Sequence, residues 1–218
     1  SSDSGSNNNS SSFSGGSSFS WGDYYKGLTK GYPTKYKDCY STDDMTTVNG
    51  DWRNDLDENG AWDYNLEKMD NAMYFFQNWN SNYGYSDLRS FNSYMPNITN
   101  LYGSFQYCYE LESWVCDTPN CYDLEYTFFG CTKLKHWRGS FSNNGNLDCR
   151  NMFGSDSSNC TQLDLASVQY IARIIPNMYA TISLGVSNTL IGSSELEEAL
   201  QQIRDKNWSV EVYYSEIG

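Results

Sequence analysis

The sequence has few basic residues. Its 218 residues include 14 lysines and arginines against 27 aspartates and glutamates, which gives a net charge of −13. A nucleic-acid-binding protein needs a basic patch to displace counterions from phosphates, and no basic run occurs here. The densest lysine cluster, Lys26, Lys30, Lys35 and Lys37, is interspersed with tyrosine and glycine, so we expect solvated lysines. We therefore predict no nucleic-acid partner.

The chain has a single histidine, His136. Any Ser-His-Asp or Cys-His catalyst would have to use it. It lies at the start of a predicted strand beside Arg138, where we expect an exposed strand residue. A hydrolase using two carboxylates is an alternative function, because acids are abundant, but no motif supports it. We predict that the protein is not an enzyme.

Long apolar runs and CxxC pairs are also absent. No run approaches the roughly 18 residues of a membrane-spanning helix, so no membrane span is expected. Seven cysteines occur, without the paired spacing that is typical of zinc sites. Cys108, Cys131 and Cys160 share one column of the repeat described next, which predicts a buried ladder of free thiols. A disulfide between neighbouring repeats, or between Cys116 and Cys121, is the open alternative, and the odd count leaves one thiol unpaired.

What the sequence does contain is a repeat with a 23-residue period. Two adjacent copies match in six columns: Ile98, Leu101, Phe105, Cys108, Leu111 and Trp114, then Cys121, Leu124, Phe128, Cys131, Leu134 and Trp137. A fixed period of this size indicates a solenoid, in which each unit buries its apolar face against the next. Steps of three and four predict a short helix or helical turn over 98–108, and residues 114–116 suit a short strand.

Two further copies fit when insertions are allowed. The upstream copy has nine extra residues, and the downstream copy has four. Their members are Leu66, Met69, Met73, Phe76, Leu88 and Phe91 upstream, and Asn146, Cys149, Phe153, Cys160, Leu163 and Ala166 downstream. We therefore expect about four units over residues 66–175.

These copies resemble a known family. Residues 98–111 and 124–134 are similar to the 23-residue leucine-rich repeat of the BspA type, with its Phe-x-x-Cys-x-x-Leu core, and residues 151–154 resemble its Met-Phe pair. The resemblance implies a parallel-strand solenoid of the kind found in bacterial surface proteins, some protist surface proteins and bacteriophage virion proteins. It implies binding or structural roles and carries no catalytic residues.

Segments of different character flank the repeats. Residues 1–20 form a Ser/Gly/Asn-rich arm, and we expect Phe13 and Phe19 to anchor it on a neighbouring subunit. Residues 21–65 are predicted to be an irregular N-terminal cap. Residues 176–218 are predicted to be a C-terminal cap, with a capping box at Ser194, a helix over 195–205 and a strand from Trp208. This ending resembles the terminal cap of repeat-bearing phage proteins. Because the first residue is Ser, we expect a processed fragment or a chain whose start was not retained.

One acidic segment resembles part of a calcium loop. Asp55, Asp57, Asn59 and Asp63 occupy the oxygen-ligand positions, and Gly60 occupies the turn. The bidentate glutamate is missing, because Leu66 stands in its place. We favour a simple acidic turn, and no other cofactor is expected.

The exposed strand positions are the predicted binding surface. Its residues are Arg89, Asn92, Glu112, Ser113, Val115, Lys135, His136 and Arg138. The predicted fold is thus a short α/β leucine-rich-repeat solenoid. The leading hypothesis is a structural or receptor-facing component of a bacteriophage virion whose partners are other protein subunits or a host surface molecule. The alternative is a fragment of a bacterial cell-surface or secreted adhesin that binds host protein or glycan.

Overall fold

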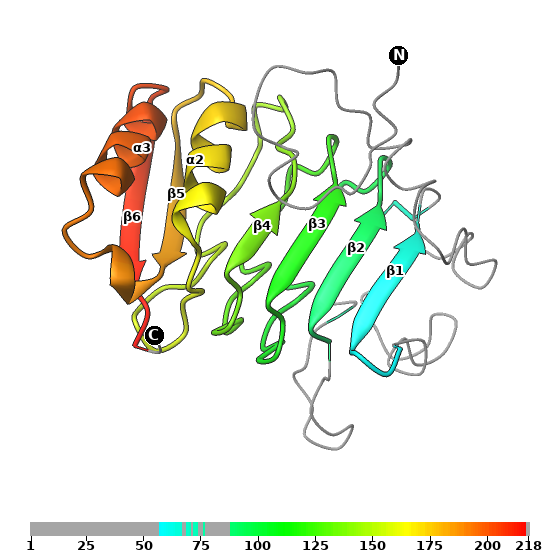
Figure 1. Cartoon of the computed structure of the whole chain (residues 1–218). Coiled ribbons are helices and arrows are strands. Elements are labelled where there is room, and N and C mark those ends of the chain that lie inside the picture. The colour runs from blue at the N-terminus through cyan, green and yellow to red at the C-terminus, as the bar shows by residue number, and fades with distance from the viewer. Residues whose placement is uncertain (1–56, 67–68, 71, 74–75, 77–87, 217–218) are drawn as a thin grey trace, which may run out of the picture.

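The computed structural model describes residues 57–66, 69–70, 72–73, 76 and 88–216. The predicted arm with Phe13 and Phe19 lies outside these residues, as does Asp55. The described fold is a mixed α/β arrangement with a four-stranded parallel sheet and a two-stranded parallel sheet (Figure 1). The strands are β1 (Ala61–Asn65), β2 (Ser90–Tyr94), β3 (Ser113–Asp117), β4 (His136–Arg138), β5 (Ala180–Val186) and β6 (Trp208–Tyr214). The helices are α2 (Leu165–Ile174), η4 (Asn188–Leu190) and α3 (Ser194–Arg204).

The four-stranded sheet follows chain order, β1-β2-β3-β4, and its register carries the 23-residue period. Ser90 pairs with Ser113, and Ser113 pairs with His136, so each strand is displaced from the last by one period. Ala61 pairs with Ser90 across a longer, 29-residue separation. The predicted stacking of equivalent strand positions is confirmed for these strands. Strand β1 lies inside the segment predicted to be irregular, so that prediction was wrong for residues 61–65.

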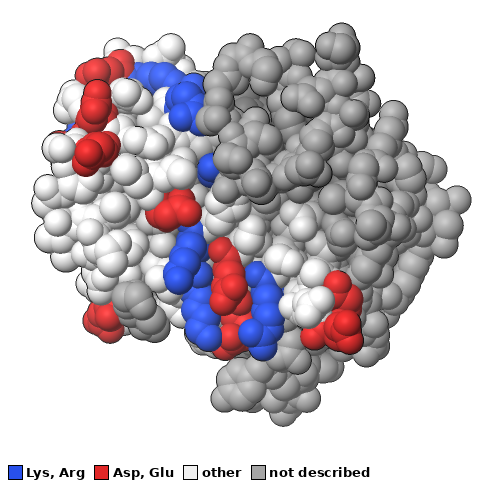
Figure 2. Space-filling model, viewed as in Figure 1, with Lys and Arg blue, Asp and Glu red and all other residues white. Residues whose placement is uncertain are grey.

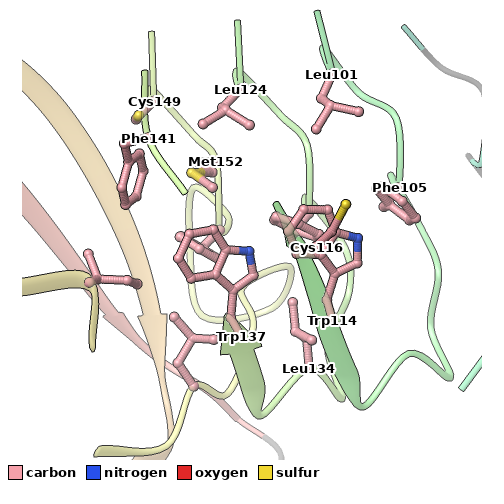
Figure 3. Close-up of a cluster of buried hydrophobic side chains, with 14 of the residues drawn as sticks. Leu101, Phe105, Trp114, Cys116, Leu124, Leu134, Trp137, Phe141, Cys149 and Met152 are labelled. Carbon is pink, nitrogen blue, oxygen red and sulfur yellow. The ribbon is translucent and has the colours of Figure 1, made fainter. Parts of the chain in front are cut away.

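Two ladders of stacked aromatic rings fill the interior. The strand ladder runs Trp62, Phe91, Trp114, Trp137, with ring centroids 6.0, 5.8 and 6.0 Å apart and interplanar angles of 13°, 10° and 3°. The turn ladder runs Phe76, Phe105, Phe128, Phe153, with centroids 4.9, 5.7 and 5.4 Å apart. The ladders pack edge to face, as between Phe105 and Trp114 at 82° (Figure 3). Each pair adds about 0.5–1.5 kcal/mol beyond area burial.

Residues 102–107 form successive turns, and no helix occurs over residues 98–108. Alternate N–H groups point in different directions: those of Leu101 and Phe105 donate to carbonyls of Asp123 and Thr127 in the next copy, at 2.8 and 2.9 Å. Those of Ser104, Gln106 and Cys108 donate to the carbonyl three residues earlier. An α-helix would keep all of these bonds within itself. The apolar residues spaced three and four apart therefore belong to consecutive turns and not to a helix.

Left-handed backbone positions explain why no helix forms. Gly103 and Tyr107 have φ values of 58° and 61°, and the equivalent Tyr126 and Gly130 have 58° and 81°. A right-handed helix cannot contain such residues. These two copies thus change direction at the same two columns.

The first copy was predicted three residues out of register. Phe76 stacks on Phe105, whereas the sequence pattern had placed Met73 in that column. Likewise, the N–H of Ala72 donates to the Asn100 carbonyl at 2.9 Å, as that of Leu101 donates to Asp123. The 29-residue spacing between these copies means that six residues are inserted rather than nine. The insertion falls within 77–87, outside the described residues.

In the last copy a helix replaces the expected strand. Helix α2 begins where a fifth strand would continue the sheet, and Asp164 caps it by accepting the Ser167 N–H at 2.8 Å. Ser167 Oγ in turn accepts the Trp137 N–H at 3.0 Å, so the helix provides a hydrogen-bond acceptor for a backbone N–H at the edge of β4. Ala166, predicted to be an apolar column, is exposed, and Val168 is buried instead. Asn146 is also exposed, with Leu147 buried beside it.

The C-terminal helix and strand agree with the prediction. The N-cap of α3 is Ser193 rather than Ser194, and its Oγ accepts the Leu196 N–H at 3.1 Å. Strands β5 and β6 run opposite to β1–β4 (Figure 1). Parallel bridges Cys149–Ile182 and Leu163–Val186 show that β5 extends the turn side of the repeats. Helix α2 therefore continues the layer of strands β1–β4, and strand β5 continues the layer formed by the turns.

The six described cysteines are free and buried. Cys108 Sγ donates to the Phe76 carbonyl at 3.2 Å, and Cys131 Sγ donates to the Phe105 carbonyl at 3.0 Å. Cys108 and Cys131 therefore link neighbouring copies through thiol hydrogen bonds, whereas Cys160 Sγ lies 3.8 Å from the Ser157 carbonyl of its own copy. The membrane criterion of a long apolar helix is met nowhere in the described ranges.

Candidate interaction surface

Four charged residues lie side by side just before β2, β3, β4 and α2. The Glu112 N–H donates to the Arg89 carbonyl at 2.8 Å, the Lys135 N–H donates to Glu112 at 3.0 Å, and the Asp164 N–H donates to Lys135 at 2.9 Å. We call Arg89, Glu112, Lys135 and Asp164 the charged ladder. The first three are exposed, and Asp164 is half-buried. Successive members alternate in sign.

Figure 2 shows blue and red side chains gathered next to one another on the lower part of the described surface. An ion pair joins two neighbouring copies close to the ladder: Lys133 Nζ lies 2.8 Å from Glu110 Oε2. Such exposed pairs stabilise the fold by at most about 1 kcal/mol each. Their larger effect is a row of fixed charges at the spacing of neighbouring strands.

The sequence predicted three members of the ladder and missed the fourth. Arg89, Glu112 and Lys135 were assigned to the binding surface. Asp164 lies beyond the place that the 23-residue period predicts from Lys135, because the last copy carries an insertion. The pair Glu110 and Lys133 was also missed, although their 23-residue separation was a usable signal.

The outward positions of the strands are less exposed than predicted. Asn92, Ser113 and His136 are half-buried. Val115 and Arg138 are 6% and 3% exposed, so their assignment to an exposed surface was wrong. The part of the predicted binding surface that is exposed or half-buried is therefore the first three members of the charged ladder, with Asn92, Ser113 and His136 beside them.

Arg138 is buried because α2 lies against β4. Its guanidinium Cζ lies 4.9 Å from the ring centre of Tyr170, and its Nη1 donates to the Trp137 carbonyl at 2.9 Å. Burial lowers the pKa of Arg138, and burial also raises the pKa of Tyr170 to about 12. The Tyr170 hydroxyl donates to the Gly139 carbonyl at 2.6 Å. Arg138 and Tyr170 thus attach the helix to the sheet.

His136 lies between the ladder and α2, with Nδ1 4.0 Å from Asp164 Oδ2. Burial and the Arg138 charge lower its pKa from 6.5 to about 4, although Asp164 acts in the opposite direction. The ring is therefore neutral at pH 7. Ser113 pairs with His136 across the strands, but no hydrogen bond joins their side chains among the described interactions. His136 and Asp164 could serve as the base and the carboxylate of a triad, but the Ser113 hydroxyl is not hydrogen-bonded to His136 as a nucleophile would be.

The acidic segment forms a turn at the start of β1. Asp57 Oδ1 accepts the N–H groups of Asn59 and Ala61 at 2.8 and 2.9 Å, and Gly60 has a φ of 71°. The Asp57 carboxylate is thus used by the backbone. Asp63 belongs to β1, and its side chain is outside the description. Within the described ranges, no three His, Cys, Asp or Glu residues are grouped closely enough to hold a metal ion.

Comparisons with known proteins give no match for this chain, whether to protein-family models, to curated proteins or to solved structures. The chemistry of its surface is therefore the basis for a functional proposal.

Proposed function

We propose that the chain is a non-catalytic interaction module built as a short leucine-rich-repeat solenoid. The observation that carries this proposal is the in-register stacking of equivalent residues, one period apart, on successive strands and turns. Stacked repeats produce extended surfaces on which equivalent side chains form rows. Such rows suit recognition of another macromolecule better than chemistry on a small substrate.

The charged ladder is the surface we assign to binding. Alternating charges hold no net field that would attract a polyanion, so the fitting partner is a protein surface with the complementary alternation. The overall charge of −13 argues further against nucleic acid. Charge contacts of this kind fix the register and orientation of the two partners. At physiological salt the Debye length is about 8 Å, and the contacts weaken as the salt concentration rises further.

We further propose that the module belongs to a bacteriophage virion, where it contacts neighbouring subunits or the host surface. The BspA-type resemblance of residues 98–134 and the helix–strand ending at 194–214 support this assignment.

A fractionation experiment tests the assignment. Particles from the producing culture are separated on a density gradient, and the chain is detected with an antibody. Recovery with intact particles at a fixed stoichiometry is the expected result. Recovery with the bacterial envelope would indicate the adhesin instead, and recovery only as free protein would contradict both.

Charge reversal tests the surface. The double variant R89E/K135E makes the ladder uniformly acidic, whereas R204E changes a charge on α3, away from the ladder. We expect R89E/K135E to lose particle association by tenfold or more, as about 1.4 kcal/mol corresponds to tenfold. R204E should associate normally. Equal behaviour of the two variants would remove the ladder from the interface.

A further inference from the structure

A shallow hollow lies on the turn side of the molecule, at the start of β5. Its volume is about 300 Å³, and its lining comes from two segments, residues 145–150 and residues 180–181. The parallel bridge between Cys149 and Ile182 places Asp148 and Arg150 beside the first residues of β5. The hollow is thus formed by two elements far apart in sequence and is separate from the charged ladder.

A bidentate ion pair fixes the polar side of the hollow. Arg150 Nε lies 3.1 Å from Asp148 Oδ1, and its Nη2 lies 2.8 Å from Asp148 Oδ2. The Asp148 Oδ1 atom also accepts the Arg150 N–H at 3.0 Å. Although burial acts to raise it, these bonds from Arg150 hold the pKa of Asp148 below its ordinary value. The pair therefore presents rigid donors and acceptors with nearly cancelled charge.

The rest of the lining is uncharged: Asn146 and Thr181 are polar, and Gly145, Leu147, Cys149 and Ala180 are apolar. Asn146 is exposed, and Thr181 contributes a hydroxyl to the lining. The preceding loop, residues 142–146, holds three asparagines and no charge. Tyr179 is 89% exposed one residue before the lining begins. Within the described residues, no hydrogen bond engages Arg150 Nη1, the Thr181 hydroxyl or the Asn146 side-chain amide.

We infer that this hollow binds a neutral pyranose sugar. A hexose ring presents hydroxyls that both donate and accept, and they match a planar Arg–Asp pair, an amide and a hydroxyl. The exposed ring of Tyr179, which directly precedes Ala180 of the lining, is the partner assigned to its apolar face. An anionic ligand fits less well, because the Glu125 carboxylate, 3.7 Å from Arg150, adds a negative charge beside the Arg–Asp pair.

The test uses the whole chain, labelled with ¹⁵N, and four probes: methyl α-glucopyranoside, methyl α-mannopyranoside, methyl β-galactopyranoside and N-acetylglucosamine. At least one should shift the amide signals of Asn146, Arg150 and Thr181 saturably, with a Kd on the order of 1 mM for so small a ligand. Sorbitol, which lacks a ring, and the anionic glucuronate should not. The absence of saturable shifts with all four pyranosides would overturn the inference, as would equal binding of glucuronate.

Variants locate the contact. Thr181→Val removes the hydroxyl at constant shape and should weaken binding by about threefold to tenfold. Tyr179→Ala should weaken it by about tenfold through loss of the ring. Gln202→Ala, on the exposed side of α3, should bind normally, and R89E/K135E should also bind normally. Unchanged affinity in both T181V and Y179A would place the sugar elsewhere, whereas loss of binding in R89E/K135E would contradict the separation of the two surfaces.

Discussion

Trp114 and Trp137 stack with ring centroids 6.0 Å apart and planes only 3° from parallel, although a full repeat separates them in sequence. Figure 3 shows both rings projecting from neighbouring strands into the same interior. Phe91 occupies the preceding place in this ladder, 5.8 Å from Trp114. The column therefore accepts either a tryptophan or a phenylalanine, which makes the ladder open to a direct test.

Trp114→Ala should lower the free energy of unfolding by about 3–5 kcal/mol, because it leaves a large cavity between Phe91 and Trp137. Trp114→Phe should cost much less, because Phe91 shows that the column fits phenylalanine. The Trp114 Nε1–H is buried, and no partner for it occurs among the described residues, so its loss carries no hydrogen-bond penalty. Urea unfolding measures both variants, and similar destabilisation by the two would contradict the ladder.

Thr127 ties two copies through its side chain. Its buried Oγ1 lies 2.7 Å from the Leu124 carbonyl and 3.0 Å from the Leu101 carbonyl of the preceding copy. Thr127→Val should therefore cost about 1 kcal/mol, since both carbonyls keep a backbone donor. Thr127→Ser, which retains the hydroxyl, serves as the control in the same unfolding measurement. A valine variant more stable than the serine variant would argue against the bond.

Gly185 packs against backbone on the turn side. A Cβ at this position would lie 2.5 Å from the Thr161 nitrogen and 2.7 Å from the Phe153 oxygen. Gly185→Ala should destabilise the fold by about 1–3 kcal/mol, because backbone atoms cannot move aside easily. Gly145→Ala is the matched control, since no atom lies within 4 Å of its Cβ position. Thermal melting compares them, and equal melting temperatures would show that β5 does not lie against Thr161.

The single histidine gives a clean pH test. The pKa of His136 is lowered to about 4 in the folded chain, against 6.5 ordinarily, so protonation favours the unfolded state. Its contribution to stability is full above pH 6.5 and is lost as the pH falls toward 4. The imidazole signal in an NMR titration should have its midpoint near pH 4. A midpoint near 6.5 would show that the ring is solvated.

His136→Asn isolates that contribution from the carboxylates, which titrate in the same range. The stability difference between wild type and variant should change between pH 6.5 and pH 4 and be constant above this window. A pH-independent difference would mean that His136 titrates alike in both states.

The repeat could be predicted from the sequence because its columns are the buried apolar side chains of the core. Phe105 and Phe128 had to be apolar and equally spaced for their rings to stack, and both are fully buried. The α3 helix and the β6 strand were legible for a similar reason, since Leu196, Leu200 and Ile203 follow helical spacing. In these elements local pattern and tertiary packing point the same way.

Other features were not local. Strand β1 pairs with β2 across a 29-residue separation, so the 23-residue period does not identify Trp62 as a member of the aromatic ladder. Residues 98–108 have the spacing of a helix, but their N–H groups alternate between the turn and the next copy, and this requires the neighbouring copy to be known. The hollow at β5 could not be anticipated, because Arg150 and Thr181 meet only through the Cys149–Ile182 bridge.

The most direct test of the central claim is a nuclear Overhauser experiment with selectively labelled aromatic residues. Cross-peaks should join the ring protons of Trp114 to those of Trp137, and those of Phe105 to those of Phe128, whose centroids are 6.0 and 5.7 Å apart. Assigned spectra that lack both cross-peaks would contradict the stacking of successive copies, and the proposals built on it would fail with it.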